Sequence, residues 1–190
     1  MPLADATRIA RLVDLTDHDL VCGQVEAIFF ETSGTQSFES EAARAAYRER
    51  WLGRYLMHFP EECFVALSND GAVVGYLAGC LEDPARSPRF SDVSYFATFS
   101  HLTPSFPAHL HINLTAGRRG EGIGAKLIEA FAGHAARAGV PGMHVVTGEG
   151  ARNNRFYLAC GFRQLGATDW MGNRIAFFGR PLASAEGDTA

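Results

Sequence analysis

The sequence lacks the features that mark several classes of protein. Its four cysteines are far apart, form no C-x-x-C pair and lie in apolar contexts, so we expect small buried thiols in a reducing compartment. No block of Lys and Arg exceeds two residues and the net charge is −4, which argues against nucleic-acid binding. No apolar run approaches the roughly 20 residues of a membrane span, and the first residues show no signal peptide. A cytoplasmic protein without a membrane partner is therefore expected.

The composition is that of a globular chain, with 190 residues, 47% hydrophobic and 20% charged. We expect one α/β domain over residues 1–183 and a disordered tail over 184–190, which is polar and small. Periodicity, capping and turn signals predict a series of strands and helices. The strands are expected at 7–14, 63–67, 73–81, 109–115, 143–147, 162–165 and 174–178, and the helices at 16–30, 40–58, 91–102, 123–138 and 152–160. Thr16 and Ser91 are the expected N-caps of two helices.

Three alternating glycines, Gly120, Gly122 and Gly124, lie between an expected strand and an expected helix. The first amide groups of a helix have no internal partner, and the helix dipole adds partial positive charge there. Glycine permits positive φ and lets a phosphate approach the backbone. The stretch therefore predicts an anion site, with an ordinary glycine-rich turn as the alternative.

The spacing of these glycines distinguishes between the known types of phosphate-binding loop. A Walker loop requires Gly-Lys-Ser/Thr, but Lys126 is preceded by alanine and followed by leucine. A dinucleotide fingerprint requires G-x-G-x-x-G and an acidic residue about 20 positions later, where this chain has His144. What remains, Arg119-x-x-Gly122-x-Gly124, is similar to the acyl-CoA pyrophosphate loop of GNAT-superfamily N-acetyltransferases.

A second cluster strengthens the resemblance. Phe156-Tyr157 followed by Gly161-Phe162, with Asn153 as a polar lead-in, resembles the closing motif of the same superfamily. The two motifs are about 33 residues apart with one strand between them, which is more specific than either motif alone. The resemblance covers about residues 7–180.

The resemblance implies an α/β fold with a central mixed, mostly antiparallel twisted sheet, splayed at the CoA site and flanked by helices. It also implies acetyl-CoA as cosubstrate and direct transfer of the acetyl group to a primary amine of a small molecule or protein. By this resemblance the residues that bind the cosubstrate are Leu114, Thr115, Ala116, Arg119, Gly120, Glu121, Gly122, Ile123, Gly124, Ala125, Asn153, Phe156 and Tyr157.

The resemblance makes Tyr157 the candidate general acid; the alternative is a core tyrosine. Many relatives carry a carboxylate base on the strand before the loop, where this sequence has His109, His111 and Asn113 on one face. Asn113 cannot accept a proton at neutral pH, whereas His111, with an ordinary pKa of about 6.5, could. Glu31, in a polar break near the usual acceptor site, is the other candidate. Structural roles for both residues stay open.

Other functions also stay open at this point. The missing strand carboxylate is compatible with a non-catalytic acyl-CoA-binding or regulatory module. So is the stretch 106–112, which resembles acetyltransferase-like domains related to those of animal O-GlcNAcases. A third hypothesis is a protein-interaction domain that uses the aromatic residues of 90–106. No metal is expected, because the histidines have no carboxylate at a fixed spacing. Homodimers are common in the superfamily, but neither a dimer nor the acceptor amine is evident from the sequence.

Overall fold

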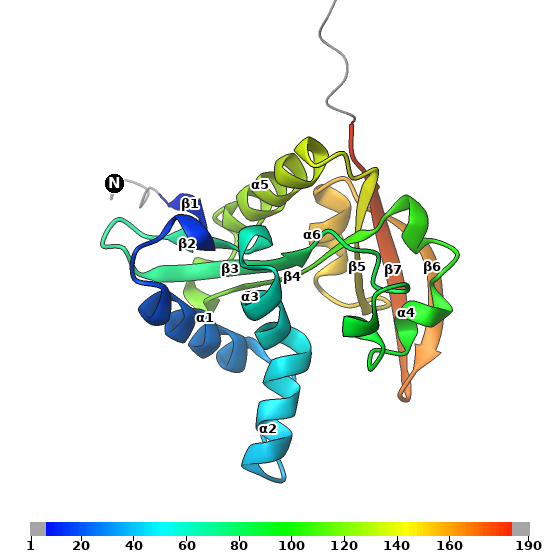
Figure 1. Ribbon diagram of the computed structural model, residues 1–190, viewed down its shortest axis with the longest axis horizontal. Coiled ribbons are helices and arrows are strands. Elements are labelled where there is room, and N and C mark those ends of the chain that lie inside the picture. The colour runs from blue at the N-terminus through cyan, green and yellow to red at the C-terminus, as the bar shows by residue number, and fades with distance from the viewer. Residues whose placement is uncertain (1–6, 184–190) are drawn as a thin grey trace, which may run out of the picture. The chain divides into compact units, whose positions relative to one another are not determined.

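The structure is a computed structural model that describes residues 7–183, so the tail predicted at 184–190 lies outside the described residues (Figure 1). The chain divides into two compact units, one of residues 7–80 with 111–131 and the other of 81–110 with 132–183. The strands form a seven-stranded sheet in the order β1-β2-β3-β4-β5-β7-β6. β4 (Ala108–Leu114) and α5 (Ile123–Arg137) each run from one unit into the other. The predicted mixed, mostly antiparallel sheet with flanking helices is confirmed.

The first unit is built on antiparallel strands. β1 (Arg8–Arg11), β2 (Phe64–Leu67) and β3 (Val73–Cys80) pair in sequence with β2 in the middle. Every residue of β2 and β3 is buried, which explains why both read as continuous apolar runs. A hairpin turn joins β2 to β3, and Gly71 has the positive φ of 85° that the turn needs.

Helices cover both faces of these strands. α1 (His18–Thr32) and α3 (Arg54–His58) contact β3, and α5 lies on the other side in Figure 1. The expected N-cap Thr16 is wrong, because α1 begins after Asp17 and no side chain caps it. The helix predicted from 40 to 58 is continuous, but its middle, Glu49–Gly53, is a π-helix.

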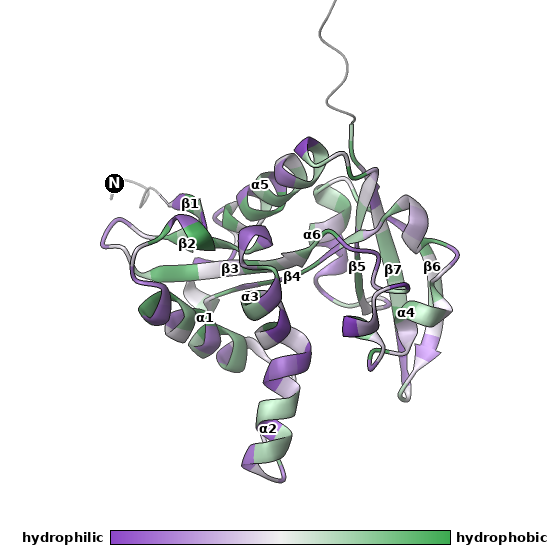
Figure 2. Ribbon diagram, in the orientation of Figure 1, coloured by the Kyte–Doolittle hydropathy of each residue, from purple (hydrophilic) through white to green (hydrophobic). Residues whose placement is uncertain are grey.

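The beginning of that run, α2 (Glu41–Arg48), differs from the rest of the unit. The Ser40 hydroxyl accepts a hydrogen bond from the Ala43 amide at 3.1 Å, as an N-cap should. None of the eight residues of α2 is buried, and hydrophilic and hydrophobic residues mix along it in Figure 2. The alanines of α2 therefore do not form a core face.

The second unit contains the end of the sheet. β5 (Gly142–Gly148) pairs in parallel with β4 and antiparallel with β7 (Asn173–Pro181), which in turn pairs with β6 (Arg163–Trp170). The hairpin turn between β6 and β7 lies at residues 171–172, because Trp170 pairs with Asn173. The helix predicted at 152–160 is present as α6 (Asn154–Ala159).

The helix predicted at 91–102 is wrong. The segment instead contains two 3-10 turns, at Pro88–Phe90 and Thr103–Ser105, around a single α-helical turn, α4 (Tyr95–Thr98). Ser91 does not cap a helix, since its hydroxyl donates to the Pro88 carbonyl at 2.9 Å. The large aromatic residues of this segment are almost fully buried: Phe90, Tyr95, Phe96 and Phe99. They complete the core of the second unit, which removes them as an interaction surface.

Candidate functional site

The glycine loop begins where β4 ends. The Thr115 amide donates to the Val74 carbonyl of β3 at 3.0 Å, and residues 116–118 then form one 3-10 turn. Gly120 and Gly122 have φ values of 85° and 77°, a region that other residues rarely enter. The third glycine, Gly124, is in the first turn of α5 and is buried. The loop therefore needs glycine at two positions for its backbone conformation.

The backbone amides at the glycines of this loop have no hydrogen-bond acceptor within the described chain. No amide of residues 120–125 donates a hydrogen bond to another group of the described chain, and the first one that does is Lys126, to the Gly122 carbonyl at 3.2 Å. A Cβ placed on Gly120 or Gly122 would meet no atom within 4 Å. Unpaired amides at the positive end of a 15-residue helix suit a phosphate group. The residues present therefore fit the pyrophosphate of an acyl-CoA.

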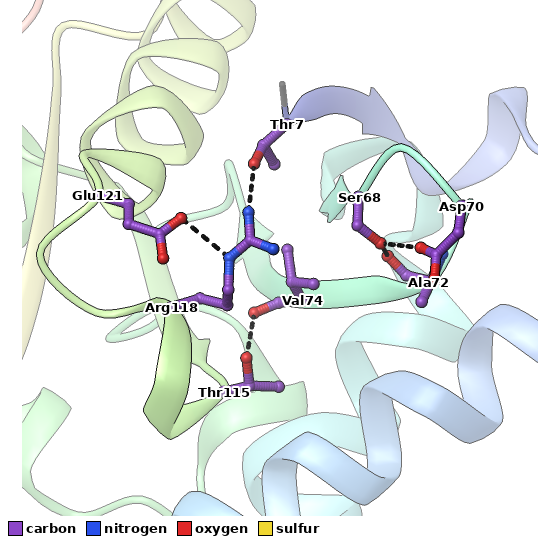
Figure 3. Close-up of polar contacts among 8 residues, drawn as sticks. All are labelled: Thr7, Ser68, Asp70, Ala72, Val74, Thr115, Arg118 and Glu121. Carbon is purple, nitrogen blue, oxygen red and sulfur yellow. Dashed lines mark hydrogen bonds and ion pairs between the residues drawn. The ribbon is translucent and has the colours of Figure 1, made fainter. Parts of the chain in front are cut away.

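The two neighbouring arginines of the loop have different environments. Arg118 is only 19% exposed; its Nε lies 2.9 Å from Glu121 Oε2, and its Nη2 lies 3.2 Å from Thr7 Oγ1 (Figure 3). Arg119, the first residue of the family-like motif, is exposed and has no ion-pair partner among residues 7–183. Arg119 is therefore the arginine available to an anion.

The edge of β4 was expected to pair with pantetheine through Leu114, Thr115 and Ala116. The register of β4 with β5 covers only two pairs, Ala108 with Met143 and His109 with His144, although both strands continue beyond them. The Thr115 amide already bonds to β3. Backbone groups alternate in direction along a strand, so those of Leu114 point away from β3, whereas Ala116 already belongs to the 3-10 turn.

Tyr157 is fixed by the end of a helix. Gly161, with φ of 82°, ends α6, and the Phe162 amide returns to the Tyr157 carbonyl at 3.1 Å while the Gly161 amide returns to Leu158 at 3.1 Å. The rings of Tyr157 and Phe162 pack with centroids 5.7 Å apart. This is a Schellman end with its usual hydrophobic contact. The Tyr-x-x-x-Gly-Phe motif therefore has a complete structural explanation apart from the tyrosine hydroxyl.

The hydroxyl of Tyr157 remains available for chemistry. The residue is 6% exposed, and burial raises its pKa above the ordinary value, so the phenol keeps its proton at neutral pH. Within the described chain the hydroxyl has no hydrogen-bond partner and is not among the fully buried polar atoms, so it reaches solvent. Phe156 packs against the Tyr157 ring at 5.2 Å. Asn153 does not cap α6; its amide donates to Thr147 Oγ1 at 3.0 Å.

His111 has an environment that suppresses its positive charge. Its ring lies edge-on to Trp51 and Tyr55, with centroid distances of 5.5 and 5.3 Å. Burial, followed by the charge of Arg54, lowers the pKa of His111 to about 4. The imidazole is therefore neutral at pH 7 and is a weaker base than an ordinary histidine.

The other two residues of that strand face have structural surroundings. His109 is 2% exposed, with its ring 4.6 Å from Phe90 and stacked 5.6 Å from His144. The Asn113 side chain donates to the Tyr76 hydroxyl at 2.8 Å. Among the described residues no group of three His, Cys, Asp or Glu side chains is placed to hold a metal ion.

Glu31 lies in the last turn of α1, which continues to Thr32, so the break expected from Glu31 onward begins two residues later. The carboxylate is exposed. A hollow of about 370 Å³ follows α1. Its lining combines two aromatic rings with polar and charged groups: Phe30, Thr35, Gln36, Phe38, Ser40, Glu41 and Arg44. The Arg44 guanidinium carbon lies 3.7 Å from the centre of the Phe30 ring.

A comparison with family models now decides the family. The model of the acetyltransferase (GNAT) family matches residues 26–162, a segment that holds both motifs. The chain belongs to the GNAT family. It is an enzyme of the N-acetyltransferase type, and an acyl-CoA is its acyl donor. None of the helices in the described part of the chain is long and apolar enough to cross a membrane.

Solved structures of other proteins share the fold. SsHAT has 20% identity and a TM-score of 0.69, with 94% of this chain and 100% of that chain covered. An apo-form variant of agmatine N-acetyltransferase has 17% identity and a TM-score of 0.66, with 94% and 100% covered. A phosphinothricin acetyltransferase from Sinorhizobium meliloti in complex with AcCoA has 21% identity and a TM-score of 0.57, with 99% and 94% covered. At these identities the likeness shows the fold alone.

The GNAT residues predicted from the sequence fall into two groups. Residues 114–116, 119–125, His111 and Glu31 belong to the first unit, whereas Asn153, Phe156 and Tyr157 belong to the second. The sequence-based prediction missed the role of Arg118 and the hollow beside Arg44. An arginine three residues before Glu121 was a visible signal for the first, but its contact with Thr7 could not be inferred locally.

Proposed function

We propose that this GNAT enzyme transfers the acetyl group of acetyl-CoA directly to a primary amine. The observation that supports the proposal best is the row of unpaired amides over residues 120–125, next to open space at Gly120 and Gly122. Amide donors without an internal acceptor at a helix start can bind a phosphate. The acyl-CoA bound to the phosphinothricin acetyltransferase supports the same class of donor here.

The reaction requires two proton transfers. The neutral amine attacks the thioester carbonyl carbon, so that a C–N bond forms and the C–S bond breaks. The amine nitrogen loses one proton to a base, and the departing CoA thiolate takes one from an acid. Tyr157 is the proposed acid, since burial keeps its phenol protonated and its hydroxyl has no competing partner in the described chain.

His111 and Glu31 remain the proposed bases. Neutral His111 has a free lone pair at pH 7, but its pKa of about 4 limits it to accepting a proton from an already acidic, positively charged adduct. Glu31 is exposed at the end of α1 and would act through water. Rates of His111→Gln and Glu31→Gln over pH 5–9 discriminate between them. The variant of the true base loses turnover, whereas the other keeps the wild-type profile.

The acceptor is proposed to be a small-molecule amine whose body occupies the hollow after α1. Two aromatic rings and the Arg44 and Glu41 side chains give this hollow both apolar and charged walls. Agmatine and phosphinothricin, named in two structural relatives, support a small charged amine. Phe38→Ala and Arg44→Ala are expected to raise KM for the amine and to leave the affinity for acetyl-CoA unchanged.

The decisive experiment is release of free CoA thiol from acetyl-CoA in the presence of a panel of primary amines. At least one amine is expected to accelerate release and to be recovered with the mass of an acetyl group added. If calorimetry shows acetyl-CoA bound but no amine accelerates release, acetyl transfer is refuted and a non-catalytic acyl-CoA module replaces it. If acetyl-CoA does not bind, the loop assignment itself is wrong.

A further inference from the structure

Arg118 joins three segments of the first unit that are far apart in the sequence. Its guanidinium contacts Glu121 within the glycine loop at 2.9 Å and Thr7, directly before β1, at 3.2 Å (Figure 3). The turn between β2 and β3 lies close enough for the Arg118 charge to act on Asp70. Hydrogen bonds from Ser68 and Ala72 are the larger causes that lower the pKa of Asp70, and Arg118 contributes after them.

The position of Glu121 makes this contact relevant to the phosphate site. Glu121 lies between Gly120 and Gly122, the two residues of the loop with positive φ, so a contact of its side chain restrains the backbone on both sides. An exposed ion pair alone stabilises little, and Glu121 is 44% exposed. The second contact of the same guanidinium, with Thr7, connects the pair to β1, which is paired with β2 from Arg8 onward.

The charge distribution also separates Arg118 from a ligand-binding arginine. Its guanidinium is 19% exposed and is already bonded to a carboxylate, which offsets its charge. The adjacent Arg119 is exposed, with no carboxylate partner in the described chain. The two adjacent arginines therefore differ: Arg119 is available to a phosphate, whereas Arg118 is bonded within the protein.

We propose that Arg118 is a positioning residue for acyl-CoA binding. It holds the loop, through Glu121 and Thr7, in the conformation that presents the amides of residues 120–125, and it does not touch the cosubstrate. The proposal rests on the proposed function of the loop as a pyrophosphate site. Without the latch (the Thr7–Arg118–Glu121 contact) the two glycines sample other conformations, and binding must order them first.

The test compares affinities for CoA and for 3′-dephospho-CoA by calorimetry, together with KM and kcat for acetyl-CoA. Arg118→Ala is expected to weaken both ligands by the same factor of about tenfold, the value of one charge-assisted hydrogen bond. KM for acetyl-CoA should rise by that factor, with kcat at saturation unchanged. Arg11→Ala is the matched control, because Arg11 forms a similar pair with Asp14 at 2.9 Å, three residues away in the same unit.

Substitutions at Thr7 keep the test decisive if Arg118→Ala unfolds. Thr7→Val preserves shape but removes the oxygen that accepts from Arg118, and it should weaken both ligands about threefold. Thr7→Ser keeps the oxygen and should bind as the wild type does. A purely steric role would give the reverse order. Thermal unfolding of each variant confirms that the binding changes are not caused by loss of the fold.

Three results overturn the proposal. If Arg118→Ala weakens CoA but not dephospho-CoA, Arg118 contacts the 3′-phosphate directly. If folded Arg118→Ala and Thr7→Val bind CoA as the wild type does, the loop needs no latch. If the wild-type protein itself fails to bind CoA, the pyrophosphate assignment is wrong, and so is the proposed role of Arg118 in acyl-CoA binding.

Discussion

The glycines before α5 and after α6 have the same left-handed backbone conformation, but the amides beside them differ in hydrogen bonding. At the end of α6, the positive φ of Gly161 lets two amides donate to helix carbonyls at 3.1 Å, so hydrogen bonds within the fold stabilise its conformation. At α5, Gly120 and Gly122 adopt similar φ values, yet the amides of residues 120–125 donate no hydrogen bond within the described chain. Contacts within the fold explain the conformation of Gly161, whereas no contact within the described residues explains the conformation of Gly120 and Gly122.

The comparison teaches how to weigh the two motifs. Tyr-x-x-x-Gly-Phe follows from ending a short helix against its own aromatic rings, so a match to it indicates the fold before it indicates chemistry. The glycine loop carries amides without a partner in the described chain, and at a helix start such amides can bind an anion. Evidence of function therefore lies mainly in the loop and, at the second motif, in the Tyr157 hydroxyl alone.

The largest expected effect tests the loop side of this comparison. Gly122→Val places a branched side chain in the open space at a φ of 77° and turns the adjacent amides away. Loss of two hydrogen bonds to a charged ligand corresponds to about a 100-fold weaker affinity. Calorimetry with CoA measures it, and thermal unfolding shows whether the variant is folded. Unchanged affinity in a folded variant would mean that the phosphate does not lie there.

The next effect concerns the one group at α6 that the helix end does not explain. Tyr157→Phe removes only the hydroxyl, so it should lower kcat about 100-fold, the usual value of a general acid, while KM for acetyl-CoA stays the same. Stability should not change, because the hydroxyl has no partner within residues 7–183. Wild-type turnover in this variant would make Tyr157 a core residue with no part in proton transfer.

A smaller effect concerns His111 in β4, the strand before the loop, and the dependence of stability on pH. The pKa of His111 is about 4 in the folded protein and about 6.5 when unfolded, so between these values the unfolded chain binds the extra proton. The stability is therefore complete above pH 6.5 and is lost progressively as the pH falls toward 4, by on the order of 2 kcal/mol. Urea unfolding at pH 7 and pH 4.5 measures the loss. His111→Gln should flatten this dependence, and an unchanged slope would assign it to other groups.

The smallest effect tests the helix-end side of the comparison. Gly161→Ala forces a side chain into φ of 82° and should destabilise the protein by about 1 kcal/mol, a few degrees in Tm. CoA affinity should be unchanged, because the hydrogen bonds at this glycine stabilise the end of α6. If the substitution leaves Tm unaltered but reduces CoA affinity, Gly161 serves CoA binding, and its assignment as a purely structural glycine is wrong.

Local signals in the sequence predicted most of the fold. The start of the helix predicted from residue 40, the break between the strands predicted at 63–67 and 73–81, and the end of the helix predicted at 123–138 each depend on neighbouring residues only. The helix predicted at 91–102 failed because long-range burial of Phe90, Phe96 and Phe99 in the second unit outweighs local propensity. Prolines at both ends then confine the segment to single turns.

The same distinction applies to the candidate site. The glycine loop was predictable because its strand, turn and helix are contiguous. The depressed pKa of His111 was not, because Arg54 and Tyr55 that surround it are more than 50 residues earlier in the chain. The ion pair of Arg118 was visible in the sequence, but its contact with Thr7, 111 positions away, required the folded structure.

The absence of buried residues in α2 has a consequence for how this enzyme can change. None of the residues of α2 is buried, so most of them can be replaced with less loss of core packing than residues of β2 and β3. Tyr47 and Arg48 are exceptions, because the Tyr47 ring packs 5.5 Å from the Phe29 ring and Arg48 Nε lies 2.6 Å from Glu26 Oε2. Arg44 and Glu41, which line the hollow, belong to the replaceable part of the helix. A library randomised only at 41–46 would keep these contacts and the donor loop, and would test whether the hollow selects the amine.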